Sequence, residues 1–204
     1  MKIKQVSLIT SFSAFFISEY LFITLNLSAL YYVGVTAGLL SVPVAAIFMK
    51  KEMKEDSKLF IPTFAILLVV LFSLTVFFYI SDRSWAVTLP ELLITPVFLE
   101  EFNFRYVIQR LLLRRLKMHS SLLIQAVIYV TYYSRYVTAD HGAGFPFPYN
   151  MLMLTSVFGM ALVYGLIAMK TRCFLASTIL HFIIWGLFPI LALFPALASS
   201  LVPT

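Results

Sequence analysis

The stretch Phe98-Leu-Glu-Glu-Phe-Asn-Phe-Arg105 places two adjacent carboxylates and an arginine inside a long apolar segment. Each such charge at the centre of a membrane helix costs roughly 2.5–3.5 kcal/mol on insertion scales. A chain keeps charged groups at that depth where they pair with one another or serve a site. Glu101 and Arg105 are four residues apart and share one helix face, with Glu100 beside them. We therefore expect the functional centre of the protein at these three residues.

The composition of the whole chain is that of an integral membrane protein. Of its 204 residues, 61% are hydrophobic and only 12% are charged, and the mean hydropathy is +0.96. A soluble domain averages about a quarter charged residues. The net charge of +6 comes from short basic clusters between apolar segments, which argues against a nucleic-acid partner. The single cysteine excludes an intrachain disulfide and a multi-cysteine metal site.

The apolar residues fall into seven segments, each near the ~20 residues that a helix needs to cross a bilayer. The sequence therefore predicts an all-α, polytopic membrane helix bundle of about seven transmembrane helices. We divide it into an N-terminal helix pair with a cytoplasmic linker (1–58), a connecting helix (59–82) and a core (83–204). The predicted segments are residues 6–27, 30–49, 59–80, 88–109, 120–138, 149–169 and 173–196.

Lysine and arginine positions predict the orientation of these segments. In an alternating arrangement of seven spans, 12 of the 15 basic residues fall on one side. By the positive-inside rule that side, with the N-terminus, is cytoplasmic. We expect the plasma membrane, in a bacterium because the chain is short and shows no soluble domain, with membrane lipid as a partner. The clusters are Lys2 and Lys4; Lys50, Lys51, Lys54 and Lys58; Arg110, Arg114, Arg115 and Lys117; Lys170 and Arg172.

Helical rise predicts which polar residues of different spans lie at the same depth. Glu100 is ten residues from Arg110, or about 15 Å along a helix. His181 is nine residues from Arg172, or about 14 Å by the same rise. Since both basic flanks are predicted to be cytoplasmic, the carboxylates and the imidazole should meet near the middle of the bilayer. Tyr133 falls somewhat nearer the external side.

This constellation has the components of an acid–base site. Two adjacent carboxylates in a low dielectric do not both ionise easily, so one of them can accept a proton from water as a general base. Arg105 would hold the other carboxylate charged and oriented. His181 could donate to a developing oxyanion or help to bind a metal. The structural alternative is a buried ion-pair cluster that only fixes helix packing.

Three features outside this constellation have structural interpretations. Glu19 lies in the middle of the first segment without an evident partner, and we interpret it as a neutral acid in a packing hydrogen bond. Gly34 and Gly38 form a GxxxG match that lets helices approach closely. Pro96 removes a backbone donor and should kink its helix.

The motifs resemble those of the CPBP intramembrane proteases, a family named for CAAX processing and bacteriocin processing or protection, also called Abi. The family's Glu-Glu-x-x-x-Arg motif is matched by Glu100, Glu101 and Arg105. Its histidine motif is matched by His181, although Trp185 stands where the family has asparagine. In its Phe-x-x-x-His motif the counterpart here is Tyr129-Val-Thr-Tyr-Tyr133, so a tyrosine replaces the histidine. The resemblance covers about residues 83–196.

The resemblance implies a membrane-embedded peptidase in which a glutamate activates water and the other motifs supply polar groups. Its substrate would be a membrane-associated peptide or a lipidated protein. Tyr133 would contribute a phenol hydrogen bond in place of imidazole. If a divalent metal such as zinc binds, its candidate ligands are Glu100, Glu101 and His181, although one histidine without cysteine is a poor set for tight zinc binding.

Two other functions remain open from the sequence. The chain could be a catalytically impaired relative that acts in bacteriocin immunity or as a peptide-binding membrane scaffold. It could also be a small transporter or channel whose glutamate pair carries protons, although no inverted repeat is visible. The sequence does not determine the oligomeric state.

Overall fold

The computed structural model describes residues 3–25, 28–81, 83–138 and 149–185, and these residues are helical with short connections and no strand. This confirms the predicted all-α class. The helices in chain order are α1 (Ile3–Leu25), α2 (Ser28–Phe48), α3 (Lys50–Ser81), α4 (Arg83–Leu92), the π-helix η1 (Leu93–Phe98), α5 (Leu99–Glu101), the π-helix η2 (Phe102–Ile108), α6 (Gln109–Leu113), α7 (Met118–Tyr133), α8 (Arg135–Thr138) and α9 (Tyr149–Thr171), followed by an unlabelled helix over Phe174–Trp185, here the 174–185 helix.

Residues 83–113 form one composite helix that changes its winding near the carboxylates. Thr95 has extended φ and ψ angles of −136° and 119°, as expected for a residue that precedes a proline. The predicted kink at Pro96 is therefore confirmed. After this kink, α5 presents the two glutamates and continues into the π-helical turns of η2. Such π-helical insertions occur frequently at functional sites.

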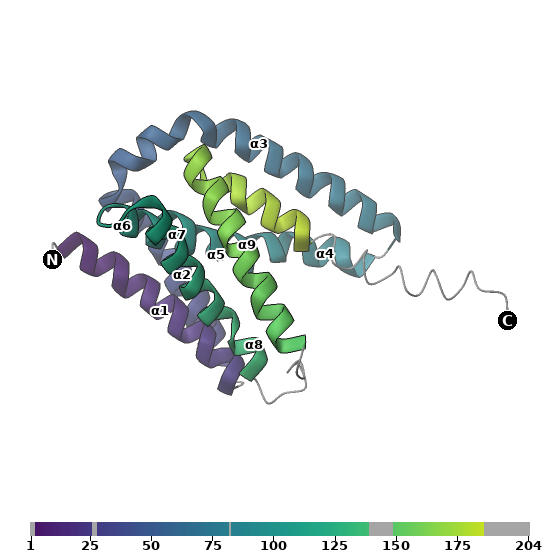
Figure 1. Cartoon of the computed structure of the whole chain (residues 1–204). Coiled ribbons are helices and arrows are strands. Elements are labelled where there is room, and N and C mark those ends of the chain that lie inside the picture. The colour runs from purple at the N-terminus through teal and green to yellow at the C-terminus, as the bar shows by residue number, and fades with distance from the viewer. Residues whose placement is uncertain (1–2, 26–27, 82, 139–148, 186–204) are drawn as a thin grey trace.

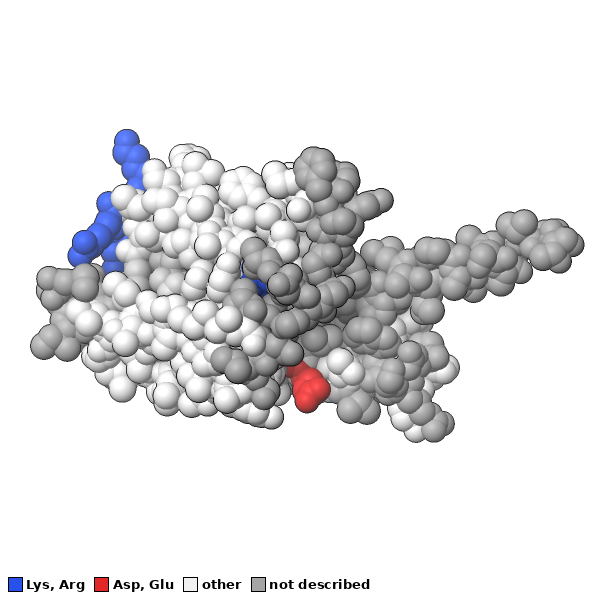
Figure 2. Space-filling model, turned by 90° about the horizontal axis from the view of Figure 1, so that it is seen from below, with Lys and Arg blue, Asp and Glu red and all other residues white. Residues whose placement is uncertain are grey.

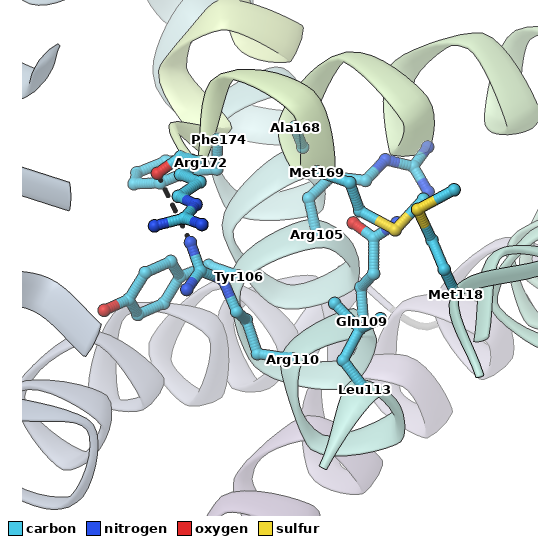
Figure 3. A pocket seen from close by; sticks show the side chains of 10 residues that line it. All are labelled: Arg105, Tyr106, Gln109, Arg110, Leu113, Met118, Ala168, Met169, Arg172 and Phe174. Carbon is cyan, nitrogen blue, oxygen red and sulfur yellow. Dashed lines mark hydrogen bonds between the residues drawn. The ribbon is translucent and has the colours of Figure 1, made fainter. Parts of the chain in front are cut away.

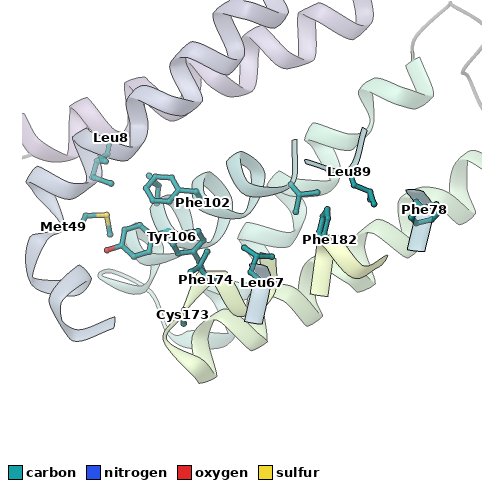
Figure 4. Packing of buried hydrophobic residues seen from close by; sticks show 14 of the residues in the cluster. Leu8, Met49, Leu67, Phe78, Leu89, Phe102, Tyr106, Cys173, Phe174 and Phe182 are labelled. Atoms are coloured by element: carbon teal, nitrogen blue, oxygen red, sulfur yellow. The ribbon is translucent and has the colours of Figure 1, made fainter. Parts of the chain in front are cut away.

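The segment 99–109 is buried on all sides because it lies between two hydrophobic clusters. Phe102 and Tyr106 pack into the first cluster, which Figure 4 shows with Phe174 and Phe182 of the 174–185 helix. Phe104 packs into the second cluster, with the aromatic residues of α1 and α7. A helix enclosed in this way places its polar residues in the interior of the bundle.

The outer surface of the bundle is apolar, as a lipid environment requires. Three described helices are long and apolar enough to cross a membrane: Ala29–Phe48, Leu59–Ile80 and Asn150–Thr171. The second runs along one side of the molecule in Figure 1, with Ile61 76% and Phe72 71% exposed. In water such a surface would be an aggregation hazard. The molecule is therefore membrane-embedded, and the predicted segments coincide with helices as far as residue 185.

Residues 50–58, the end of the predicted N-terminal part with its cytoplasmic linker, are helical. These residues form the first turns of α3, which is continuous from Lys50 to Ser81. Lysine, glutamate and methionine are strong helix formers, and the stretch has no glycine or proline to interrupt a helix. The division into three parts remains a prediction. Residues 139–148, with Asp140 and His141, connect the predicted segments 120–138 and 149–169 and lie outside the described residues.

Candidate active site

Glu100 and Glu101 are the last two residues of α5, and both side chains are completely buried. Asn103 and Arg105, from the first turns of η2, are buried with them. Adjacent residues on a helix point about 100° apart, so the two glutamates face different neighbouring helices. Each carboxylate therefore has a separate set of partners.

Glu101 is held by a cation and by an imidazole. The Arg105 Nε atom donates to Glu101 Oε2 at 3.3 Å. His181 Nδ1, on the 174–185 helix, lies 3.1 Å from Glu101 Oε1. The meeting of a carboxylate with His181, predicted from helical depth alone, is confirmed by this distance.

Trp185 determines the tautomer of His181. Its indole Nε1 donates to His181 Nε2 at 2.9 Å. An indole nitrogen can only donate, so Nε2 must be the acceptor. The imidazole proton is then on Nδ1, where it is donated to Glu101. In this conformation neither ring nitrogen is available to a metal or to a developing oxyanion, and the ring stacks on Tyr164 with 5.0 Å between the centroids.

Glu100 has a different environment, with one oxygen bound and one open. Tyr133 donates to Glu100 Oε2 at 2.7 Å, and Tyr129 does so at 3.1 Å. The two tyrosines are four residues apart on α7 and share its inner face. Glu100 Oε1 makes no hydrogen bond to any residue that the structure describes. Its charged neighbour is Arg135, whose Nη2 atom lies 3.7 Å away.

Arg135 and Glu19 extend this cluster in a way that the sequence analysis did not predict. Arg135, which is not part of the predicted cytoplasmic clusters, is 1% exposed and lies over the Tyr132 ring at 3.6 Å. Its Nη1 atom is 3.7 Å from Glu19 Oε2 on α1. Arg135 is thus a partner of Glu19 that the sequence analysis did not identify. The available signal was that an ionisable residue in mid-span needs a partner.

The close approach of α1 and α2 at this point depends on Gly34. A Cβ atom at that position would lie 2.6 Å from Glu19 Oε1, closer than real side chains allow. The GxxxG match therefore does more than pack two helices, since its first glycine makes room for a buried carboxylate. At Gly38 a Cβ atom would meet the rings and methyl groups of Phe15 and Leu99 instead.

A pocket of about 390 Å³ begins at Arg105 and runs toward the basic end of the molecule. Figure 3 shows its lining side chains around α6 and the C-terminal end of α9. The Nη1 and Nη2 atoms of Arg105 make no hydrogen bond within the described part of the chain. The two glutamates do not line this pocket, whereas Arg105, which is bonded to Glu101, does.

The predicted metal ligands do not form a metal site in this conformation. Within residues 3–25, 28–81, 83–138 and 149–185, no group of three or more His, Cys, Asp or Glu side chains is arranged to hold an ion. Glu101 and His181 are bonded to each other, and Glu100 faces the tyrosines of α7. The donor set therefore does not fit a metal, and we derive no chemical step from one.

The fold and this site together define a membrane-embedded helix bundle with a buried glutamate, arginine and histidine cluster. The family model of the type II CAAX prenyl endopeptidases, Rce1-like, matches residues 82–187. This is just over half of the chain, and the chain belongs to this family of membrane proteases. The match confirms the resemblance described above. No curated protein and no solved structure matches the chain significantly.

Proposed function

We propose that this protein is an active endopeptidase that cleaves near the C-terminus of a prenylated protein at the membrane. The observation that carries the proposal is the unequal binding of the two oxygens of Glu100. Oε2 is fixed by two tyrosine hydroxyls, and Oε1 is left without a hydrogen bond among the described residues. A general base needs this combination of a fixed orientation and one open acceptor.

The proposed reaction is hydrolysis of one peptide bond. A water molecule on Glu100 Oε1 gives a proton to the carboxylate as its oxygen attacks the carbonyl carbon. The proton then passes from Glu100 to the departing nitrogen, and the C–N bond breaks. The products are a new carboxylate and a new amine, and Glu100 returns to its starting state.

The neighbours of Glu100 have positioning roles in this proposal. Tyr133 and Tyr129 fix the carboxylate from α7, and Arg135 provides a nearby positive charge. Glu101, Arg105 and His181 form a second bonded set that holds α5 and η2 against the 174–185 helix. Because both carboxylates are fully buried, substrate and water reach them only when the surrounding helices separate.

The decisive experiment uses the purified protein in liposomes with a prenylated peptide that ends in Cys-aliphatic-aliphatic-X. Glu100→Gln should lower turnover by about 10²–10⁴-fold, the range for loss of a general base, because an amide cannot take a proton from water. The matched control is Glu91→Gln, which changes an exposed carboxylate of α4 and should keep full activity. Full activity in Glu100→Gln would contradict the proposal.

A second candidate function is a non-catalytic role, in bacteriocin immunity or as a peptide-binding scaffold. The hydrogen bond from Trp185 to His181 favours this role. The tryptophan stands where the family has asparagine, and its indole N–H binds His181 Nε2, which is then not available to a substrate. In that case the protein should bind peptides without cleaving them, and Glu100→Gln should leave both binding and protection nearly unchanged.

We further propose that the N-terminus is cytoplasmic, in the plasma membrane of a bacterium. Lys and Arg side chains gather at one end of the molecule in Figure 2, and exposed Arg114, Arg115 and Lys117 connect α6 to α7. In a Cys173→Ser background, a cysteine at position 141 should react with a membrane-impermeant maleimide in intact cells. A cysteine at position 54 should react only after lysis. Labelling of position 54 from outside would reverse the orientation.

A further inference from the structure

The pocket that begins at Arg105 combines positive charge with an apolar wall. Its polar lining residues are Arg105, Gln109, Arg110 and Arg172. Its other lining residues are the aromatic Tyr106 and Phe174 and the apolar Leu113, Met118, Ala168 and Met169. We propose that this pocket binds the C-terminal end of the peptide substrate, with the terminal carboxylate on the arginines and the preceding aliphatic side chains on the apolar wall. This inference rests on the proposed function.

The state of Arg105 is the main evidence for an anionic ligand. Its guanidinium is 1% exposed and uses Nε for Glu101. Nη1 and Nη2 have no hydrogen-bond partner in the described chain, and the side chain lines the pocket in Figure 3. A buried cation with two unused donors is costly, and a guanidinium presents its donors in the geometry of a carboxylate. A carboxylate in the pocket would satisfy both nitrogens.

The other polar lining residues add positive charge farther along the same pocket. Arg110 donates to the backbone oxygen of Arg172 at 3.3 Å, which holds these two residues together across the pocket (Figure 3). Gln109 donates to the Gly165 oxygen at 3.0 Å and holds α6 against α9. The pocket walls are therefore tied together by bonds between helices.

The length of a cleaved C-terminal peptide agrees with this placement. Arg105 is five residues and Arg110 ten residues from Glu100, so they lie no more than about 7.5 Å and 15 Å along the helix from it, the α-helical values, because the π-helical turns of η2 rise less per residue. Three extended residues span about 10 Å. If the peptide bond after the fourth residue from the C-terminus is cut at Glu100, three residues follow it. They would bring the terminal carboxylate between the levels of these two arginines.

The apolar wall favours a peptide over a free inorganic anion as the ligand. A volume of about 390 Å³ is in the usual range for pockets that enclose small ligands. Two methionines contribute to this wall, and their flexible thioethers adapt to aliphatic side chains of different shape. A free phosphate would use the arginines and leave this wall without a ligand group.

The test compares two prenylated peptides that differ only in a C-terminal carboxylate or a C-terminal amide. In wild-type protein, the amide should raise KM by about ten-fold or more, as expected for the loss of a charged hydrogen bond, with little effect on kcat. In Arg110→Gln and Arg172→Gln, KM for the carboxylate peptide should rise toward that of the amide. Lys170→Gln is the matched control, because this exposed residue on α9 does not line the pocket.

Binding of the same peptides to Glu100→Gln, measured by fluorescence anisotropy, separates this inference from the proposed function. A preference for the carboxylate without any turnover in wild type would support the pocket and reject the enzyme. Turnover without a preference for the carboxylate would overturn the inference and leave the enzyme standing. Equal displacement of both peptides by phosphatidylglycerol vesicles would also overturn it, because the arginines would then hold a lipid phosphate.

Discussion

The two adjacent glutamates of α5 are identical in chemistry and opposite in environment. Both oxygens of Glu101 are bound, one to Arg105 and one to His181. Glu100 has one oxygen on two tyrosines and one without a hydrogen bond in the described chain. A saturated carboxylate fixes structure, whereas an open one can bind water. Under the proposed function, Glu101 is therefore the structural glutamate of the motif and Glu100 the chemical one.

Helix geometry produces this difference. Successive side chains on a helix are rotated by about 100°, so Glu101 faces the 174–185 helix when Glu100 faces α7 and α8. The first of these neighbours provides an imidazole that is already held by Trp185. The second provides phenols and Arg135. The predictions below test whether substitutions at Glu100 and at Glu101 have separate effects on activity and on stability.

The largest effect on stability is expected for Glu101→Gln. The substitution leaves Arg105 as a buried cation without its counter-charge, and removing one partner of a buried pair costs about 3–5 kcal/mol. The purified variant should unfold at a clearly lower temperature in detergent, and its activity should fall with the loss of folded protein. Glu100→Gln should lose activity at nearly wild-type stability. Equal loss of stability in both variants would mean that the two glutamates do not have separate roles.

A smaller effect is expected for the tyrosines that bind Glu100. Tyr133→Phe removes the shorter of the two hydrogen bonds, and turnover should fall by about ten-fold, the value of one charged hydrogen bond. Tyr129→Phe should have a smaller effect. Tyr133→His restores the residue of the related motif and should maintain or raise turnover. The control is Tyr79→Phe, which makes the same change at an exposed position of α3. An unchanged turnover in Tyr133→Phe would remove this tyrosine from the site.

The sequence was sufficient to predict the features of the site that depend only on the position of a residue along its helix. Apolar segment lengths located the helices, and residue counts from the basic flanks placed Glu101 and His181 at one level. Depth does not determine the direction in which a side chain points around its helix. The bond between Trp185 and His181 was therefore not predictable, since it depends on how the 174–185 helix is rotated.

Long charged side chains are the other source of error. Arg135 follows α7 at the end of a span, where an arginine is usually exposed to water or headgroups, yet its guanidinium turns back toward Glu19 and Glu100. Flexible stems of this kind carry a charge away from the level of the backbone. Counting residues therefore did not predict where the charge of Arg135 lies. The same counting could not find the partner of Glu19 on another helix.

The smallest effect on turnover is expected for substitutions near Glu19, which contacts Arg135. In Gly34→Ala the new methyl group would lie 2.6 Å from Glu19 Oε1 and must displace the carboxylate. Since the 3.7 Å contacts of Arg135 transmit this change to Glu100 indirectly, turnover should fall only a few-fold, and Glu19→Gln should have a similar effect.

The matched control for Gly34→Ala is Gly159→Ala on α9, where a Cβ atom would meet no other atom within 4 Å. Both substitutions gain about 1 kcal/mol of helix propensity, so a difference between them reports the displacement of Glu19. Neither Glu19 nor Gly34 lies within the family match at residues 82–187. Reduced turnover in Gly34→Ala and Glu19→Gln, but not in Gly159→Ala, would therefore make α1 and α2 part of the active site. Wild-type turnover in all three variants would confine the site to the matched residues.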